Sequence, residues 1–112
     1  MILVIGPVRH DNPDVVAERL LEAEKFSAWL FVQRGDMVVN GPGVMHPFFQ
    51  HLPFDVAERM NRMWCEKASE LAVLKIDGWD KSAGLKNEML WFGEHGKPVT
   101  SYVKTETGYV AQ

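Results

Sequence analysis

The chain has 112 residues, which fits a single domain, and 46% of them are hydrophobic, enough to form a core. Twelve basic residues against fifteen acidic ones give a net charge of −3, and the basic residues form no cluster. Nucleic-acid binding requires concentrated positive charge, so we expect no nucleic-acid partner, although one phosphate needs only a few local donors. A small core leaves a small margin of stability, so we expect a homo-oligomer.

The cysteine content and the first residues bear on the compartment. Cys65 is the single cysteine and cannot form an intrachain disulfide, so we expect a buried thiol in a cytoplasmic protein. The apolar run at the amino terminus has five residues, too few for a signal sequence or a membrane span. We therefore expect no membrane partner.

The first predicted elements are a strand and a long helix. Residues 2–5 form a continuous apolar run, typical of a strand covered on both faces, and a Gly-Pro pair ends it. Asn12 followed by Pro13 is a typical helix start, with a capping side chain before a proline at the first helical position. Apolar residues then keep near-helical spacing, which predicts one helix that ends near Arg34.

The middle of the chain predicts a short strand, a loop and a second helix. Residues 37–39 are apolar, which predicts a second, short strand. Residues 40–51 are rich in glycine and proline, which block regular structure, so we expect a long loop there. Asp55 opens the next helix, which continues to about Ala68.

A third strand and a third helix follow. Residues 71–76 form an apolar run, and residues 77–80 are a turn. The helix extends from Ser82 to about His95, and Gly96 is suited to end it in a left-handed conformation.

Residues 99–103 predict a fourth strand, and the tail after about residue 104 is expected to fray. The alternation of strands and helices predicts an α/β domain of the three-layer, flavodoxin- or Rossmann-like class. We expect an open parallel sheet of about four strands in the order 2-1-3-4, with helices on both faces. Ligands of such sheets bind at the carboxyl ends of the strands, where residues 6–11, 40–51 and 77–82 should meet.

The first of these segments supplies a candidate binding loop, Gly6, Pro7, Val8 and Arg9. Glycine permits a ligand to approach the backbone closely, and Arg9 could pair with a phosphate or a carboxylate. The alternative is that Arg9 is an ordinary surface arginine after a strand.

The segment after the third strand carries four further candidates, Trp79, Ser82, Gly84 and Glu88. Ser82 stands where a helix begins, and its hydroxyl and the free amides of the first turn make a natural anion site. Gly84 keeps the backbone bare beside the crevice, and the Glu88 side chain leans back towards it. The alternatives are structural: Ser82 as a helix cap, Gly84 for tight helix–strand packing and Glu88 as a solvated residue.

Together these residues resemble a known family. Gly-Trp-x-x-Ser-x-Gly-x-x-x-Glu after an apolar strand resembles the nucleoside 2-deoxyribosyltransferase superfamily, and a small branch of it most of all. The Ser-x-Gly-x-x-x-Glu part is also similar to the deoxynucleoside 5′-monophosphate N-glycosidases, as is Gly-Pro-Val-Arg after the opening strand. The resemblance covers about residues 1–102, and implies that residues 1–112 are one such domain.

The resemblance also implies roles. Glu88 falls on the nucleophile that attacks the anomeric carbon, and Ser82 on a phosphate-binding serine of the N-glycosidases. Gly84 falls on the motif glycine, and Arg9 on an arginine of the substrate loop. A carboxylate nucleophile splits glycosidic cleavage into two easier steps, which agrees with the residues present. The nucleophile must be ionised, so we expect nearby donors to keep Glu88 charged.

One departure from the family concerns a further aspartate that helps to protonate the leaving base. The corresponding position falls near Asn61 or Arg62, and asparagine cannot act as an acid. Glu66, further along the same helix, and Asp55, at its start, are the acids that could substitute.

We expect no metal and no cofactor, because the histidines match no common zinc spacing and no cysteine pair supports them. The first functional hypothesis is cleavage or transfer of the N-glycosidic bond of a nucleoside or nucleoside 5′-monophosphate. The second is a nucleotide-binding or sensing domain that lost the chemistry, and the third is an interaction module that uses the fold as a scaffold.

Overall fold

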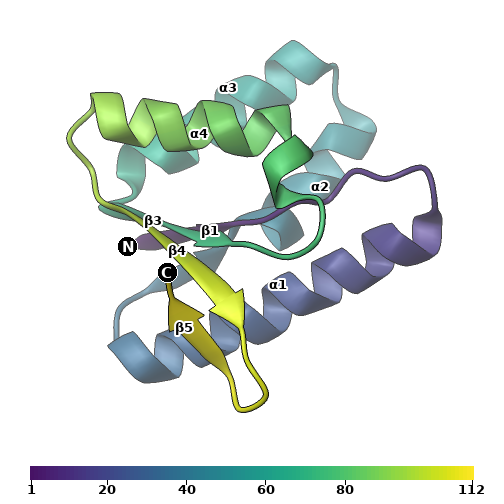
Figure 1. Cartoon of the computed structure of the whole chain (residues 1–112). Coiled ribbons are helices and arrows are strands. Elements are labelled where there is room, and N and C mark those ends of the chain that lie inside the picture. The colour runs from purple at the N-terminus through teal and green to yellow at the C-terminus, as the bar shows by residue number, and fades with distance from the viewer.

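The computed structural model describes all residues, 1–112, as a five-stranded sheet with helices packed on it (Figure 1). In chain order the elements are β1 (Ile2–Ile5), α1 (Pro13–Arg34), β2 (Val38–Asn40), α2 (Gly41–His51), α3 (Phe54–Lys67), β3 (Glu70–Leu74), the short 3-10 helix η1 (Trp79–Lys81), α4 (Ala83–Glu94), β4 (Val99–Lys104) and β5 (Tyr109–Ala111).

The strand order is β2-β1-β3-β4-β5, and the first four strands are parallel. This confirms the predicted order 2-1-3-4. The tail does not fray as expected, because β5 pairs antiparallel with β4 at the edge of the sheet. Tyr109 anchors it: its ring centre lies 4.9 Å from that of Phe26 and 5.2 Å from that of Trp29, both on α1.

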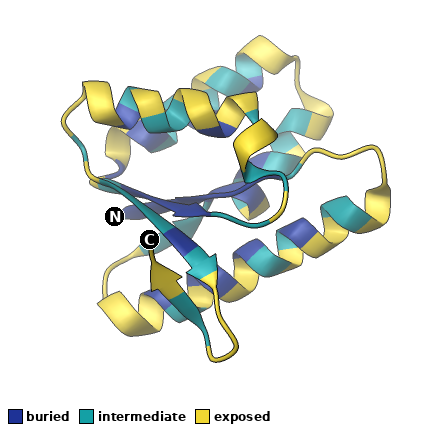
Figure 2. Ribbon diagram, viewed as in Figure 1, coloured by how far each residue is buried: buried dark blue, intermediate teal, exposed yellow.

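The central strands are covered on both faces, which explains their continuous apolar sequences. Side chains alternate across a strand, so Leu3 and Ile5 pack with α3 and α4, whereas Ile2 and Val4 pack with α1. Figure 1 shows α1 on one side of the sheet and α3 and α4 on the other. The burial colours of Figure 2 show β1 fully enclosed between these two layers.

The longest helix, α1, begins and ends as its sequence predicts. The Asn12 side chain accepts a hydrogen bond from the Asp14 amide, Pro13 occupies the first turn, and Gly35 ends the helix with φ 69°. No helix, α1 included, is both long enough and apolar enough to cross a membrane.

The segment 40–51, expected to be a loop, is mostly the helix α2. The Asn40 side chain caps it by accepting from the Gly43 amide at 3.3 Å. Glycine and proline are tolerated at Gly41–Gly43 because first-turn amides have no partner within a helix. Burial of Pro42 and Met45 then favours the helix over the loop, although Pro47 removes one internal hydrogen bond.

Candidate functional site

A cavity of about 700 Å³ opens at the carboxyl ends of the parallel strands. The loop after β1, the start of α2 after β2 and the segment from Gly78 to Glu88 after β3 line it, and α3 closes one side. Its volume is within the range of small-molecule sites, and its position is where open parallel sheets bind ligands.

The start of α4 presents unpaired backbone donors to this cavity. The Ser82 hydroxyl accepts a hydrogen bond from the Leu85 amide at 3.3 Å and so caps the helix. The Ala83 and Gly84 amides have no acceptor within the chain. Free amides at a helix start, together with the helix dipole, form a site suited to an anion.

Gly84 has no packing reason to be glycine. A Cβ atom built on it would meet only the Ser82 Oγ, at 3.9 Å. Tight helix–strand packing is therefore not the explanation for this residue. Its effect is to leave the backbone of the first turn open to the cavity that it lines.

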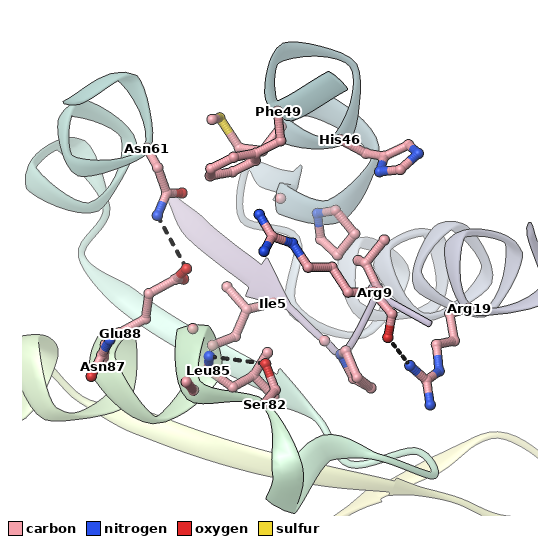
Figure 3. Close-up of a pocket in the computed structure, with 18 of the residues that line it drawn as sticks. Ile5, Arg9, Arg19, His46, Phe49, Asn61, Ser82, Leu85, Asn87 and Glu88 are labelled. Atoms are coloured by element: carbon pink, nitrogen blue, oxygen red, sulfur yellow. Dashed lines mark hydrogen bonds between the residues drawn. The ribbon is translucent and has the colours of Figure 1, made fainter. Parts of the chain in front are cut away.

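Arg9 extends from the loop after β1 towards Phe49 (Figure 3). Its guanidinium carbon lies 5.9 Å from the Phe49 ring centre and 5.6 Å from that of Phe54. Arg9 forms no ion pair within the chain. The aromatic rings thus hold the guanidinium in place and leave its planar donors free for an anionic group.

Positive charge predominates around the cavity, although the chain as a whole carries −3. The charged groups that line it are the cations of Arg9, Arg19, Arg62 and Lys81 and the carboxyl groups of Glu58 and Glu88. A concave site with a local excess of cations favours a ligand that carries negative charge.

Glu88 faces α3 across the cavity. Asn61 Nδ2 donates to Glu88 Oε1 at 3.1 Å, and the two side chains point towards each other in Figure 3. Glu88 Oε2 is buried without a partner. Burial raises the pKa of Glu88 from 4.5 to about 7, and the Asn61 hydrogen bond offsets only part of that rise. The expectation that donors keep Glu88 fully charged therefore fails, because one neutral amide does not replace the lost hydration.

Arg62 follows Asn61 on α3, and its charge acts on Glu88. Its guanidinium carbon lies 4.9 Å from the Trp91 ring centre, and its Nη1 is buried without a partner. The positive charge lowers the pKa of Glu88, but less than burial raises it. Two buried polar atoms of opposite charge thus remain without a partner on this side of the cavity.

Arg19, which the sequence analysis did not single out, ties two of the lining loops together. It lies on α1, is 9% exposed, and donates from Nη1 to the Arg9 carbonyl at 2.7 Å. Its guanidinium also packs on Gly78, whose φ of 93° and missing side chain leave the necessary space. The sequence signal was a charged residue one turn before Ala23 on the buried face of α1.

The structure brings most of the predicted site residues to one place. The cavity is lined by Gly6, Pro7, Val8, Arg9, Ser82, Gly84 and Glu88. Trp79 does not line it; its ring packs against the core, with Lys75 Nζ 4.5 Å from its centre. Glu66 does not line it either, because five residues beyond Asn61 is about 140° around the helix.

Comparison with family models matches residues 3–104 to the family described as "Domain of unknown function (DUF1937)". The match includes the four parallel strands, apart from Ile2 at the start of β1, and every residue named above as lining the cavity. Among curated proteins, no sequence matches this chain.

Proposed function

The chain belongs to the DUF1937 family, and from its cavity we propose that it cleaves or transfers the N-glycosidic bond of a nucleoside or nucleoside 5′-monophosphate. Glu88 is the nucleophile in this proposal. The first turn of α4 and Arg9 bind the negatively charged part of the substrate.

The observation that carries the proposal is that one cavity contains both an acidic group and an anion site. The Glu88 carboxyl and the free amides of Ala83 and Gly84 belong to the same helix and line the same space. A nucleoside monophosphate has matching parts, a phosphate and an electrophilic anomeric carbon joined by one sugar. The resemblance of Ser82, Gly84 and Glu88 to the N-glycosidase motif agrees with this arrangement.

In the proposed reaction, the Glu88 carboxylate attacks the anomeric carbon while the bond to the base nitrogen breaks. Asn61 holds the carboxylate through Oε1, which orients it for attack. The resulting sugar ester is then released to water, giving hydrolysis, or to a second base, giving transfer.

The test is to incubate the purified protein with a panel of nucleosides and 5′-monophosphates and to measure free base by chromatography. The proposal expects base release by the wild-type protein and none by Glu88→Ala. A panel in which no compound loses its base would overturn it.

The second candidate function, a nucleotide-binding domain without turnover, is favoured by a specific observation. Asn61 stands near the position where the resemblance implies an acid, and the pKa of Glu88 is raised to about 7. Saturable binding of a nucleotide in calorimetry, with no base released, would identify this function.

We further propose that the protein acts in the cytoplasm as a homo-oligomer and takes a small molecule as its partner. Cys65 is buried and unpaired, as is usual in a reducing compartment. Sedimentation at micromolar concentration tests the assembly, and a clean monomer would contradict it.

A further inference from the structure

The acids of α3 differ in their position relative to the cavity. The helix carries Asp55, Glu58 and Glu66, and of these Glu58 lines the cavity. Glu58 and Glu88 are the two carboxyl groups among all the lining residues. Asp55 and Glu66, the two acids that the sequence offers as replacements for the missing family acid, both lie outside the cavity.

Glu58 lies close to the reacting side of the cavity. It precedes Asn61 by three residues and Arg62 by four, so all three share one face of α3. Asn61 contacts Glu88 directly at 3.1 Å. The negative charge of Glu58 also contributes to the raised pKa of Glu88, although burial is the larger cause.

Glu58 is also available for chemistry. It is half-buried, makes no hydrogen bond or ion pair within the chain, and caps no helix end. Glu88, the nucleophile of the proposed function, is instead held in place by the hydrogen bond from Asn61. Glycosidic cleavage through a covalent intermediate uses two carboxyl groups, and Glu58 and Glu88 are the two that line this cavity.

We propose that Glu58 is the second catalytic carboxyl group, the proton donor to the leaving base and then the proton acceptor from water. The inference rests on the proposed function and assigns the residue that replaces the acid missing at Asn61.

The two steps balance with water as the only co-reactant. In the first, a Glu88 oxygen bonds to the anomeric carbon, the carbon–nitrogen bond breaks, and its electron pair stays on the base nitrogen. That nitrogen takes the proton of the Glu58 carboxylic acid. In the second, water bonds to the anomeric carbon and gives a proton to the Glu58 carboxylate. The ester bond to Glu88 breaks, and both side chains return to their starting forms.

The test is Glu58→Gln, with Glu66→Gln as the matched control on the same helix outside the cavity. With ordinary nucleotides, Glu58→Gln should lower kcat by about 10²- to 10⁴-fold, the usual share of acid–base catalysis. Glu66→Gln should leave kcat unchanged. The Glu58 side chain makes no internal hydrogen bond, so its replacement should leave the fold intact, which circular dichroism checks.

A substrate with an N7-methylated purine separates catalysis from a structural role. Its base already carries a positive charge and leaves without protonation. Glu58→Gln should therefore release one equivalent of base from it rapidly, then slow down, because water is no longer activated to release the sugar. The assignment is supported if Glu58→Gln gives this burst with the methylated substrate and gives none with ordinary nucleotides.

Two results would overturn the inference while leaving the proposed function in place. One is wild-type kcat for Glu58→Gln on ordinary nucleotides. The other is an equal loss of the first turnover on both kinds of substrate, which would indicate a role other than proton transfer. Failure of the wild-type protein to release base from any nucleotide, methylated or not, would instead overturn the proposed function itself.

Discussion

The two helices that face each other across the cavity contribute different kinds of groups. α4 presents backbone amides of its first turn, fixed by the helix, and the enclosed Glu88 carboxyl. α3 presents side chains alone, and the polar ones are those of Glu58, Asn61 and Arg62. Backbone amides are free at a helix start only when the neighbouring residues cap the helix and leave the backbone open. A side chain on a helix face, by contrast, can be exchanged without disturbing the helix. The α4 side therefore carries a recognisable motif, and the α3 side departs from it.

The largest effect is expected from removing Glu88, the proposed nucleophile, on the α4 side. Glu88→Ala should lower base release by about 10³-fold or more, because it removes a covalent route and not a single contact. Single-turnover assays with a nucleoside monophosphate measure this loss. Retention of wild-type turnover by Glu88→Ala would end the assignment of Glu88.

Ser82→Ala tests the proposed anion site at the first turn of α4. A hydrogen bond to a charged group contributes roughly 1.5–3 kcal/mol, so binding of 5′-monophosphates should weaken about tenfold to a hundredfold. Nucleosides without phosphate should bind as before, and calorimetry with matched pairs of ligands distinguishes the two.

The control for this variant is Asn12→Ala, which removes the cap of α1 away from the cavity. Both variants should lose about 1 kcal/mol of stability, but Asn12→Ala should bind the monophosphate normally. Equal weakening of binding by both would mean that Ser82 acts only as a cap.

The raised pKa of Glu88 predicts how stability depends on pH. Its carboxyl is protonated in both folded and unfolded protein below pH 4.5, but between 4.5 and about 7 only the folded protein keeps the proton. The free energy of unfolding should therefore fall as the pH rises through this interval, by on the order of 1–3 kcal/mol.

Glu88→Gln removes the titration, so its stability should change less than that of the wild type between pH 5 and pH 8. Urea unfolding at the two pH values measures the difference. Parallel pH profiles for the two proteins would show that the carboxyl is not enclosed as described.

The smallest effect is expected from replacing glycines of α4 with alanine, which should affect stability and ligand binding differently. Gly84→Ala should raise the free energy of unfolding by roughly 0.5–1 kcal/mol, because alanine favours a helix and meets nothing closer than Ser82 Oγ. Gly93→Ala, on the same helix and with nothing within 4 Å, should stabilise similarly. Only Gly84→Ala should weaken monophosphate binding in calorimetry; equal binding by both variants would exclude a ligand beside Gly84.

The fold was largely predictable because its signals are local. Continuous apolar runs marked the buried strands, and Asn12 and Gly35 marked the ends of α1. The helix α2 was missed because Pro42 and the glycines around it resemble a loop, whereas tertiary burial stabilises the helix. The strand β5 was missed because three residues carry too little pattern, and Tyr109 is held by contacts with distant aromatic rings.

The candidate site was predictable where the backbone is involved and unpredictable where side chains converge. Ser82, Gly84 and Glu88 have a fixed spacing on one helix and could be recognised together. Trp79 was placed in the site because it follows a strand, but the turn directs its ring to the core. Glu58 could not be identified, since which side of a helix faces a cavity depends on the packing of the other helices. Arg19 stands out as a charged residue on the buried face of α1, but its contacts with Arg9 and Gly78 depend on how the loops pack.

The contact between Arg19 and Gly78 has a consequence for how the family varies. Any side chain at position 78 would occupy the space of the guanidinium, and the backbone there has a φ that side chains disfavour. The glycine after β3 therefore cannot gain a side chain while the arginine on α1 stays in place, although the two residues are far apart in the chain. In an alignment of DUF1937 sequences, chains with a side chain at position 78 should therefore lack the arginine at position 19, whereas chains without the arginine should still keep the glycine because of its φ.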